Sequence, residues 1–106
     1  MLEKTYTYTL EDAKKIEKLI DDDPVLINHI VLPKGDGLPE HYSNSNVYLI
    51  IVRGQINLKL EEQEQQTYDR GNIVNIPYNT KMNIKNLRDD ILEFFVVKVP
   101  NPKHYK

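Results

Sequence analysis

Hydrophobic residues recur at every second position through most of the chain after residue 24, a period that predicts β-strands. Ile56, Leu58 and Leu60 alternate with polar residues in the segment 55–61, and Met82 and Ile84 do so in the segment 81–86. Such alternation is typical of antiparallel strands with one buried and one solvated face. Clusters of turn-forming residues separate these segments at the short intervals expected of a sandwich or barrel. The chain beyond residue 24 is therefore predicted to be antiparallel β-structure.

The segment before residue 24 has a different pattern. The stretch TYTYT at 5–9 alternates and is compatible with a short edge strand. Between Leu10 and Ile20 the apolar positions fall at helical spacing, and Thr9 with Asp12 resembles a capping box. We predict a short helix that ends before Pro24, because a proline disfavours helical geometry in the residue before it.

The run VYLIIV at 47–52 is apolar on both faces of a predicted strand. A barrel interior can bury only one of these faces, so the other needs cover from the N-terminal helix or from another subunit. Exposed apolar patches on globular proteins usually mark interfaces. We therefore expect a homodimer.

The length of 106 residues suits a single domain, and the chain shows no internal repeat. We assign 1–106 to one domain, with an N-terminal strand or helix segment at 1–23 and a barrel at about 25–100.

Charge and composition exclude several classes of partner. The net charge is −2 and the basic residues are scattered, so nucleic acid is not an expected partner. No apolar run is long enough for a membrane-spanning helix and no secretory signal is visible, which predicts a soluble, cytoplasmic protein without a membrane partner. The chain has no cysteine, so any metal would have to be held by His and oxygen ligands.

The spacing of glycines, prolines and His41 resembles the two motifs of the cupin superfamily. The first frame comprises Gly35, five residues, His41, Tyr42, Ser43, three residues, Val47, six residues and Gly54. The second comprises Gly71, five residues, Pro77, Tyr78, Asn79, two residues, Met82, three residues and Asn86, and sixteen residues separate the frames. The resemblance covers about residues 30 to 100. It implies a mainly β, cupin-like antiparallel barrel of the jelly-roll type, preceded here by the short N-terminal helix.

In the family, the motif positions of His41, Ser43, Val47 and Met82 carry the metal ligands His, His, Glu and His. Only His41 matches, and valine cannot coordinate a metal. Transition metals need several converging nitrogen, sulfur or carboxylate donors. We therefore predict no metal and no cofactor, although Glu40, Asn44, Asn46 or His29 could supply a ligand if they turned inward.

We predict that His41, Ser43 and Met82 face a common interior space and, with Asn86, bind a small, largely uncharged ligand. Ser43 and Asn86 could equally be local turn hydrogen-bonders, and Met82 could be plain core. Two alternatives stay open: a metal-independent isomerase or epimerase with His41 as acid or base, and a structural or interaction protein with a filled barrel. His29, in LINHIVL, is expected to be an ordinary strand position.

Overall fold

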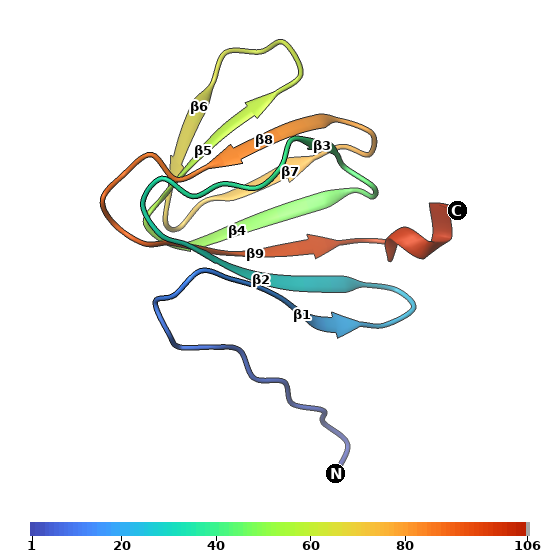
Figure 1. The fold of residues 1–106 in the computed structure, drawn as a ribbon. Coiled ribbons are helices and arrows are strands. Elements are labelled where there is room, and N and C mark those ends of the chain that lie inside the picture. Colours follow the sequence, from blue (N-terminus) through green and yellow to red (C-terminus); the bar gives the residue numbers. More distant parts are fainter. Residues whose placement is uncertain (106) are drawn as a thin grey trace.

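The computed structural model describes residues 1–105, and antiparallel β-strands make up most of it (Figure 1). Five strands form one sheet in the order β1-β2-β9-β4-β7, and four form a second in the order β3-β8-β5-β6. Their bounds are β1 (Lys15–Asp21), β2 (Leu26–Leu32), β3 (His41–Tyr42), β4 (Val47–Arg53), β5 (Gln55–Leu60), β6 (Gln66–Asp69), β7 (Ile73–Ile76), β8 (Lys81–Lys85) and β9 (Leu92–Lys98). A 3₁₀ helix, η1 (Pro102–Tyr105), follows β9. The mainly β prediction is confirmed.

The core lies between the two sheets and is made by one side of each inner strand. On β4, Val47, Leu49 and Ile51 are buried, whereas Tyr48 and Val52, on the opposite face of the strand, are exposed. The same period buries Phe94 on β9 and its neighbours two residues away, because successive strand side chains point to opposite faces. Each fully buried side chain of this kind contributes roughly 1.5 to 3 kcal/mol to folding.

The predicted N-terminal helix is wrong, and no α-helix occurs within residues 1–105. Lys15–Asp21 instead forms the edge strand β1, which pairs with β2 from Lys15 opposite Val31 to Asp21 opposite Leu26. Leu10, the first apolar residue of the helical pattern, is 87% exposed, so the start of that pattern is not buried in the structure. The remaining residues, Lys15–Asp21, form their backbone hydrogen bonds with the open edge of β2. The TYTYT stretch is not a strand in the structure.

Two turns in the predicted motif frames need unusual backbone angles. Gly54, between β4 and β5, has φ of 80°, and a Cβ there would lie 2.2 Å from the Ile91 carbonyl oxygen. Asn79, which takes a turn position where the family has glycine, has φ of 62°. Asparagine tolerates this left-handed conformation better than most residues, so the turn before β8 forms without glycine.

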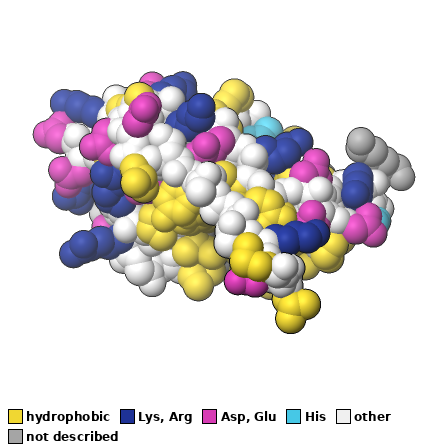
Figure 2. Space-filling view, turned by 90° about the horizontal axis from the view of Figure 1, so that it is seen from below, with side chains coloured by type: hydrophobic (Ala, Val, Ile, Leu, Met, Phe, Trp, Pro, Cys, Tyr) yellow, Lys and Arg dark blue, Asp and Glu magenta, His cyan; other side chains and the backbone are white. Residues whose placement is uncertain are grey.

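Several large hydrophobic side chains remain exposed. They include Leu10 in the N-terminal segment, Ile16 on β1, Val52 on β4 and Ile73 on β7. Figure 2 views the molecule from the side of β1 and the N-terminal segment, and shows hydrophobic side chains gathered between groups of charged ones. On the outer face of β4, Tyr48 and Val52 are exposed, and the homodimer stays a prediction. No helix in the described part of the chain is long and apolar enough to cross a membrane.

Candidate ligand-binding cavity and a buried histidine network

A cavity of about 130 Å³ lies between the sheets near the start of β4 and the end of β9. Most of its wall is apolar, with a few polar side chains among the lining residues. The lining consists of Ile16, Asn28, Ile30, Leu38, His41, Ser43, Asn44, Val47, Leu49, Met82, Ile84, Val96 and Lys98. The cavity therefore draws on β1, β2, β3, β4, β8 and β9 and on the loops beside them.

The structure brings His41, Ser43 and Met82 to this one cavity. His41 and Met82 are directly opposite each other in the short β3–β8 pairing, which places their side chains on the same face. Met82 is buried and belongs to the hydrophobic core, whereas His41 is exposed at the edge of the cavity. The ligand-binding role of all three stays a prediction.

The His41 side chain has one hydrogen-bond partner. Its Nδ1 lies 2.8 Å from the Pro39 carbonyl oxygen. A carbonyl can only accept, so Nδ1 carries the hydrogen and donates it. In the neutral ring Nε2 is then an acceptor, free to receive a hydrogen bond from a bound molecule.

Ser43 and Asn86 are held by the backbone. The Ser43 hydroxyl donates to the Pro77 carbonyl at 2.6 Å and accepts from the Thr80 amide at 2.8 Å, which ties β3 to the turn before β8. The Asn86 amide nitrogen donates to the carbonyls of Leu32 and Asp90, both at 2.8 Å.

The Asn86 amide oxygen accepts from the Arg88 amide at 3.0 Å. Asn86 is fully buried and is not among the residues that line the cavity. Asn86 therefore holds the β8–β9 loop in place and lies outside the cavity.

Two polar side chains of the cavity were missed by the sequence prediction. Asn28 on β2 and Lys98 on β9 both line it. The Asn28 amide oxygen is buried and has no hydrogen-bond partner in the described structure. Burial lowers the pKa of the Lys98 ammonium, and the nearby charge of Lys18 lowers it further. The sequence carried a signal for Lys98, because Phe94, Val96 and Lys98 alternate along β9 and therefore share one face of the strand.

The cavity does not fit the metal that the family motif implies. Among the described residues, His41 is the one imidazole that lines it and no Asp or Glu does, and the chain has no Cys. Among the described residues, no group of three or more His, Cys, Asp or Glu side chains could hold a metal ion. Glu40 and Asn46 do not line the cavity, and His29 lies elsewhere, as described next. Val47 is fully buried at the position of the family's carboxylate ligand, so a divalent ion there would lack charge compensation.

His29 on β2 is fully buried on the opposite side of the five-stranded sheet from the cavity. Its Nδ1 lies 2.7 Å from Glu17 Oε2 on β1, and its Nε2 lies 2.6 Å from Glu93 Oε2 on β9. A ring with hydrogen on both nitrogens can donate to both carboxylates at once. The sequence prediction, which treated His29 as an ordinary strand position, did not anticipate this network.

The network continues outward to the N-terminal segment. Arg53 Nε lies 3.2 Å from Glu93 Oε1, and Arg53 Nη2 lies 2.9 Å from Asp12 Oδ1. The Tyr8 ring packs on His29 with 4.5 Å between ring centroids. These contacts hold Tyr8 and Asp12 of the irregular N-terminal segment against the sheet.

Glu17 receives a second hydrogen bond from the same segment, because the Thr9 amide donates to Glu17 Oε2 at 2.9 Å. This backbone hydrogen bond, followed by the one from His29, lowers the pKa of the Glu17 carboxyl. Hydrogen bonds to the charged form favour that form. Glu17 on β1 is therefore hydrogen-bonded both to the N-terminal segment, through Thr9, and to β2, through His29.

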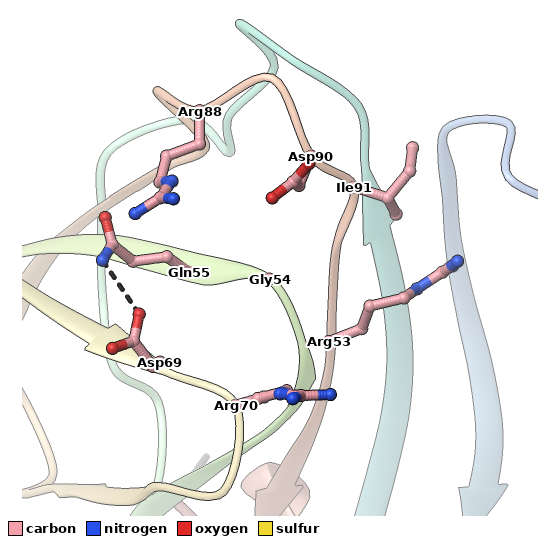
Figure 3. A pocket seen from close by; sticks show the side chains of 8 residues that line it. All are labelled: Arg53, Gly54, Gln55, Asp69, Arg70, Arg88, Asp90 and Ile91. Atoms are coloured by element: carbon pink, nitrogen blue, oxygen red, sulfur yellow. Dashed lines mark hydrogen bonds between the residues drawn. The ribbon is translucent and has the colours of Figure 1, made fainter.

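A wider, more open hollow of about 650 Å³ lies at the other end of the barrel (Figure 3). Arg53, Arg70 and Arg88 surround it, but Asp69 and Asp90 lie among them. The Gln55 amide nitrogen donates to Asp69 at 2.9 Å, which occupies part of the rim. Charges of both signs on exposed side chains do not select one class of ligand.

Known proteins resemble the chain over nearly its whole length. A functionally uncharacterized protein of Methanocaldococcus jannaschii is 54% identical over 104 residues, which span 97% of this chain and 90% of that protein. A crystal structure of a cupin family protein with a double-stranded β-helix fold, also from Methanocaldococcus jannaschii, matches with a TM-score of 0.95 and 53% identity. The match covers 99% of this chain and 97% of that structure.

More distant structures share the fold alone. A cupin superfamily protein from Desulfitobacterium hafniense has a TM-score of 0.74 at 13% identity, over 89% of this chain and 84% of its own. No family model matches the chain.

Proposed function

Because the chain belongs to the cupin family, we propose that it uses its barrel as a metal-free binding module that takes one small molecule into the cavity beside His41. The observation that carries the proposal is the cavity itself: an apolar space between the sheets with a few polar side chains at defined points. Ligand sites in proteins have this composition, in which apolar walls supply burial and a few polar groups supply orientation.

The size of the cavity limits the ligand. Its volume of about 130 Å³ is well below that of the pockets that hold drug-sized molecules, roughly 300 to 1,000 Å³. It is close to that of an apolar cavity of about 150 Å³ that admits benzene. The ligand should therefore contain on the order of six to eight non-hydrogen atoms.

His41 supports binding better than it supports catalysis. Its Nε2 is available at the edge of the cavity, because Nδ1 is held by the Pro39 carbonyl. A reaction with His41 as acid or base would benefit from a second acid or base on the other side of the substrate. Among the described residues no Asp or Glu lines the cavity to supply a carboxyl group for this, and its other ionisable side chain is the Lys98 ammonium, which can hold an anion. The geometry therefore favours a binding protein over an isomerase or epimerase.

A titration of the ¹⁵N-labelled protein with small molecules of this size tests the proposal. The set should contain neutral and charged compounds, and backbone NMR shifts report where each binds. We expect shifts at Val47, Met82 and Val96 for at least one compound.

The variant Met82→Phe should block binding, since the larger ring enters the cavity. The control Ile73→Phe adds a ring at an exposed site on β7 and should leave binding intact. Absence of cavity shifts with every compound, or unchanged binding by Met82→Phe, would favour the filled barrel instead.

A further inference from the structure

The ionisable side chains of the cavity, which define its charge, are a lysine and a histidine. Lys98 and His41 line it, and no carboxylate in the described part of the chain does. A second lysine, Lys18 on β1, is close enough to Lys98 for their charges to interact. Lys18 has its own partner, Asp21, at 3.6 Å, and Asp21 also accepts from Asn101 at 2.6 Å. Neither Asp21 nor Asn101 lines the cavity. The electrostatic potential inside the cavity is therefore positive.

Lys98 is a half-buried cation that has no counter-ion among the described residues. It lies opposite Leu26 on β2 and Val47 on β4, which are both buried. None of the ion pairs of the described residues includes Lys98. Burying an unpaired charge is costly, and the lowered pKa of Lys98 reflects that cost. A bound anion would pair with the Lys98 ammonium and offset the cost of burying its charge.

Asn28 adds a second requirement. It lies opposite Val96 on β9, so Asn28 and Lys98 are diagonal neighbours on the cavity side of the β2–β9 pair. The buried Asn28 amide oxygen has no donor in the described structure, and an unpaired buried acceptor costs about 1 to 3 kcal/mol. A ligand that donates a hydrogen bond at this point would satisfy it. A hydroxyl suits the site better than an ammonium, which the two lysines would repel.

Resting on the proposed binding function, we propose that the ligand is a small hydroxycarboxylate, with its carboxylate on Lys98, its hydroxyl on Asn28 and its carbon chain against Val47, Leu49 and Val96. This replaces the uncharged ligand expected from the sequence, because that expectation did not include Lys98. A carboxylate suits the cavity better than a phosphate, since a single lysine and no arginine line the small space.

Four probes test the proposal on the full chain: 2-hydroxybutyrate, butyrate, butyramide and inorganic phosphate, each titrated by NMR. Butyramide has the shape of butyrate without the charge. We expect butyrate to bind about tenfold or more tightly than butyramide, because hydrogen bonds between charged groups are the stronger ones. Phosphate should bind more weakly than butyrate. Equal affinity for butyrate and butyramide, or tighter binding of phosphate, would overturn the carboxylate assignment.

Variants assign the two contacts. Lys98→Met keeps the stem of the side chain, should fold because it removes an unpaired buried charge, and should abolish the preference for butyrate over butyramide. Lys59→Met, at an exposed lysine on β5 outside the cavity, should keep it. A preference that survives Lys98→Met would contradict the role of Lys98. The wild-type comparison of butyrate with butyramide tests the charge even if that variant does not fold.

For the hydroxyl, 2-hydroxybutyrate should bind more tightly than butyrate to the wild type and equally to Asn28→Leu. Equal binding of the two acids to the wild type would refute the hydroxyl contact. If none of the four probes binds and the wider set also fails, the proposed binding function itself is wrong. Binding of neutral compounds alone would preserve that function and reject the carboxylate.

Discussion

His29 and His41 lie on opposite sides of the five-stranded sheet and differ in almost every contact. His29 is 0% exposed and has a carboxylate oxygen within 2.7 Å of each ring nitrogen. His41 is exposed and uses one nitrogen, on the Pro39 carbonyl. A histidine whose polar atoms are all paired within the protein holds structure together, whereas one with a free nitrogen beside a cavity can serve a ligand.

The substitution His29→Leu should have the largest effect on stability. It removes one hydrogen-bond partner from each of two carboxylates, leaving Glu17 with the Thr9 amide and Glu93 with Arg53. Loss of a hydrogen bond to a charged group costs about 1.5 to 3 kcal/mol. Urea denaturation measures the loss. The matched variant His41→Leu should change stability by less than about 0.5 kcal/mol, as exposed substitutions usually do. Equal losses in the two variants would remove the distinction between the two histidines.

The substitution His41→Ala should have the reverse profile. We expect ligand affinity to fall about tenfold, the cost of one lost hydrogen bond in a partly buried site, with little change in urea stability. A titration with butyramide measures the affinity, because its amide N–H can donate to His41 Nε2, whereas butyrate has no hydrogen to donate. His104→Ala is the control, because His104 is an exposed histidine in η1 whose Nε2 lies 2.9 Å from the Asp23 carbonyl oxygen, away from the cavity. Unchanged affinity in His41→Ala would remove His41 from the site.

As the pH falls, the contacts of Glu17 with His29 and Thr9 should lose their contribution to the free energy of unfolding. The pKa of Glu17 is lowered in the folded state from its usual 4.5, by the Thr9 amide and then His29. A carboxyl with a depressed folded pKa contributes stability above the unfolded pKa, and that contribution is lost as the pH falls through the folded pKa.

Urea stability should therefore decline below about pH 4.5 less steeply in Glu17→Gln than in the wild type. Glu40→Gln, at an exposed residue next to His41, is the control and should follow the wild type. Identical acid profiles for Glu17→Gln and the wild type would exclude Glu17 as a source of the decline.

The outer face of the five-stranded sheet is covered differently at its two edges, near β1 and at β7. The N-terminal segment covers the His29 end, whereas Ile73 on β7 is 65% exposed, opposite Ile50 on β4. We still expect a second copy to cover this apolar area. Ile73→Lys should give a monomer by sedimentation at micromolar concentration with little change in urea stability. A monomeric wild type would refute the dimer.

Strand period and motif spacing were sufficient to predict the barrel, because alternation and turns are local properties of the chain. They failed before residue 24, where the spacing of Leu10, Ile16 and Ile20 fitted a helix while the open edge of β2 favoured a strand. The edge becomes visible only when the sheet is assembled.

The site was predicted only as far as the motif frame extended. His41, Ser43 and Met82 were found because the frame fixes their parity. Lys98 and Asn28 lie outside both frames, and the pairing of β2 with β9 that joins them spans most of the sequence. The His29 network was missed for the same reason, since Glu17, His29 and Glu93 come from three strands.

The most direct test follows the side-chain nitrogen resonances of both histidines while butyrate is added. The central claim is that the cavity beside His41 binds the ligand and the His29 network does not. We predict that the His41 Nε2 resonance moves with the titration, and that both His29 ring nitrogens stay unchanged. Movement of the His29 resonances with a stationary His41 would contradict the account.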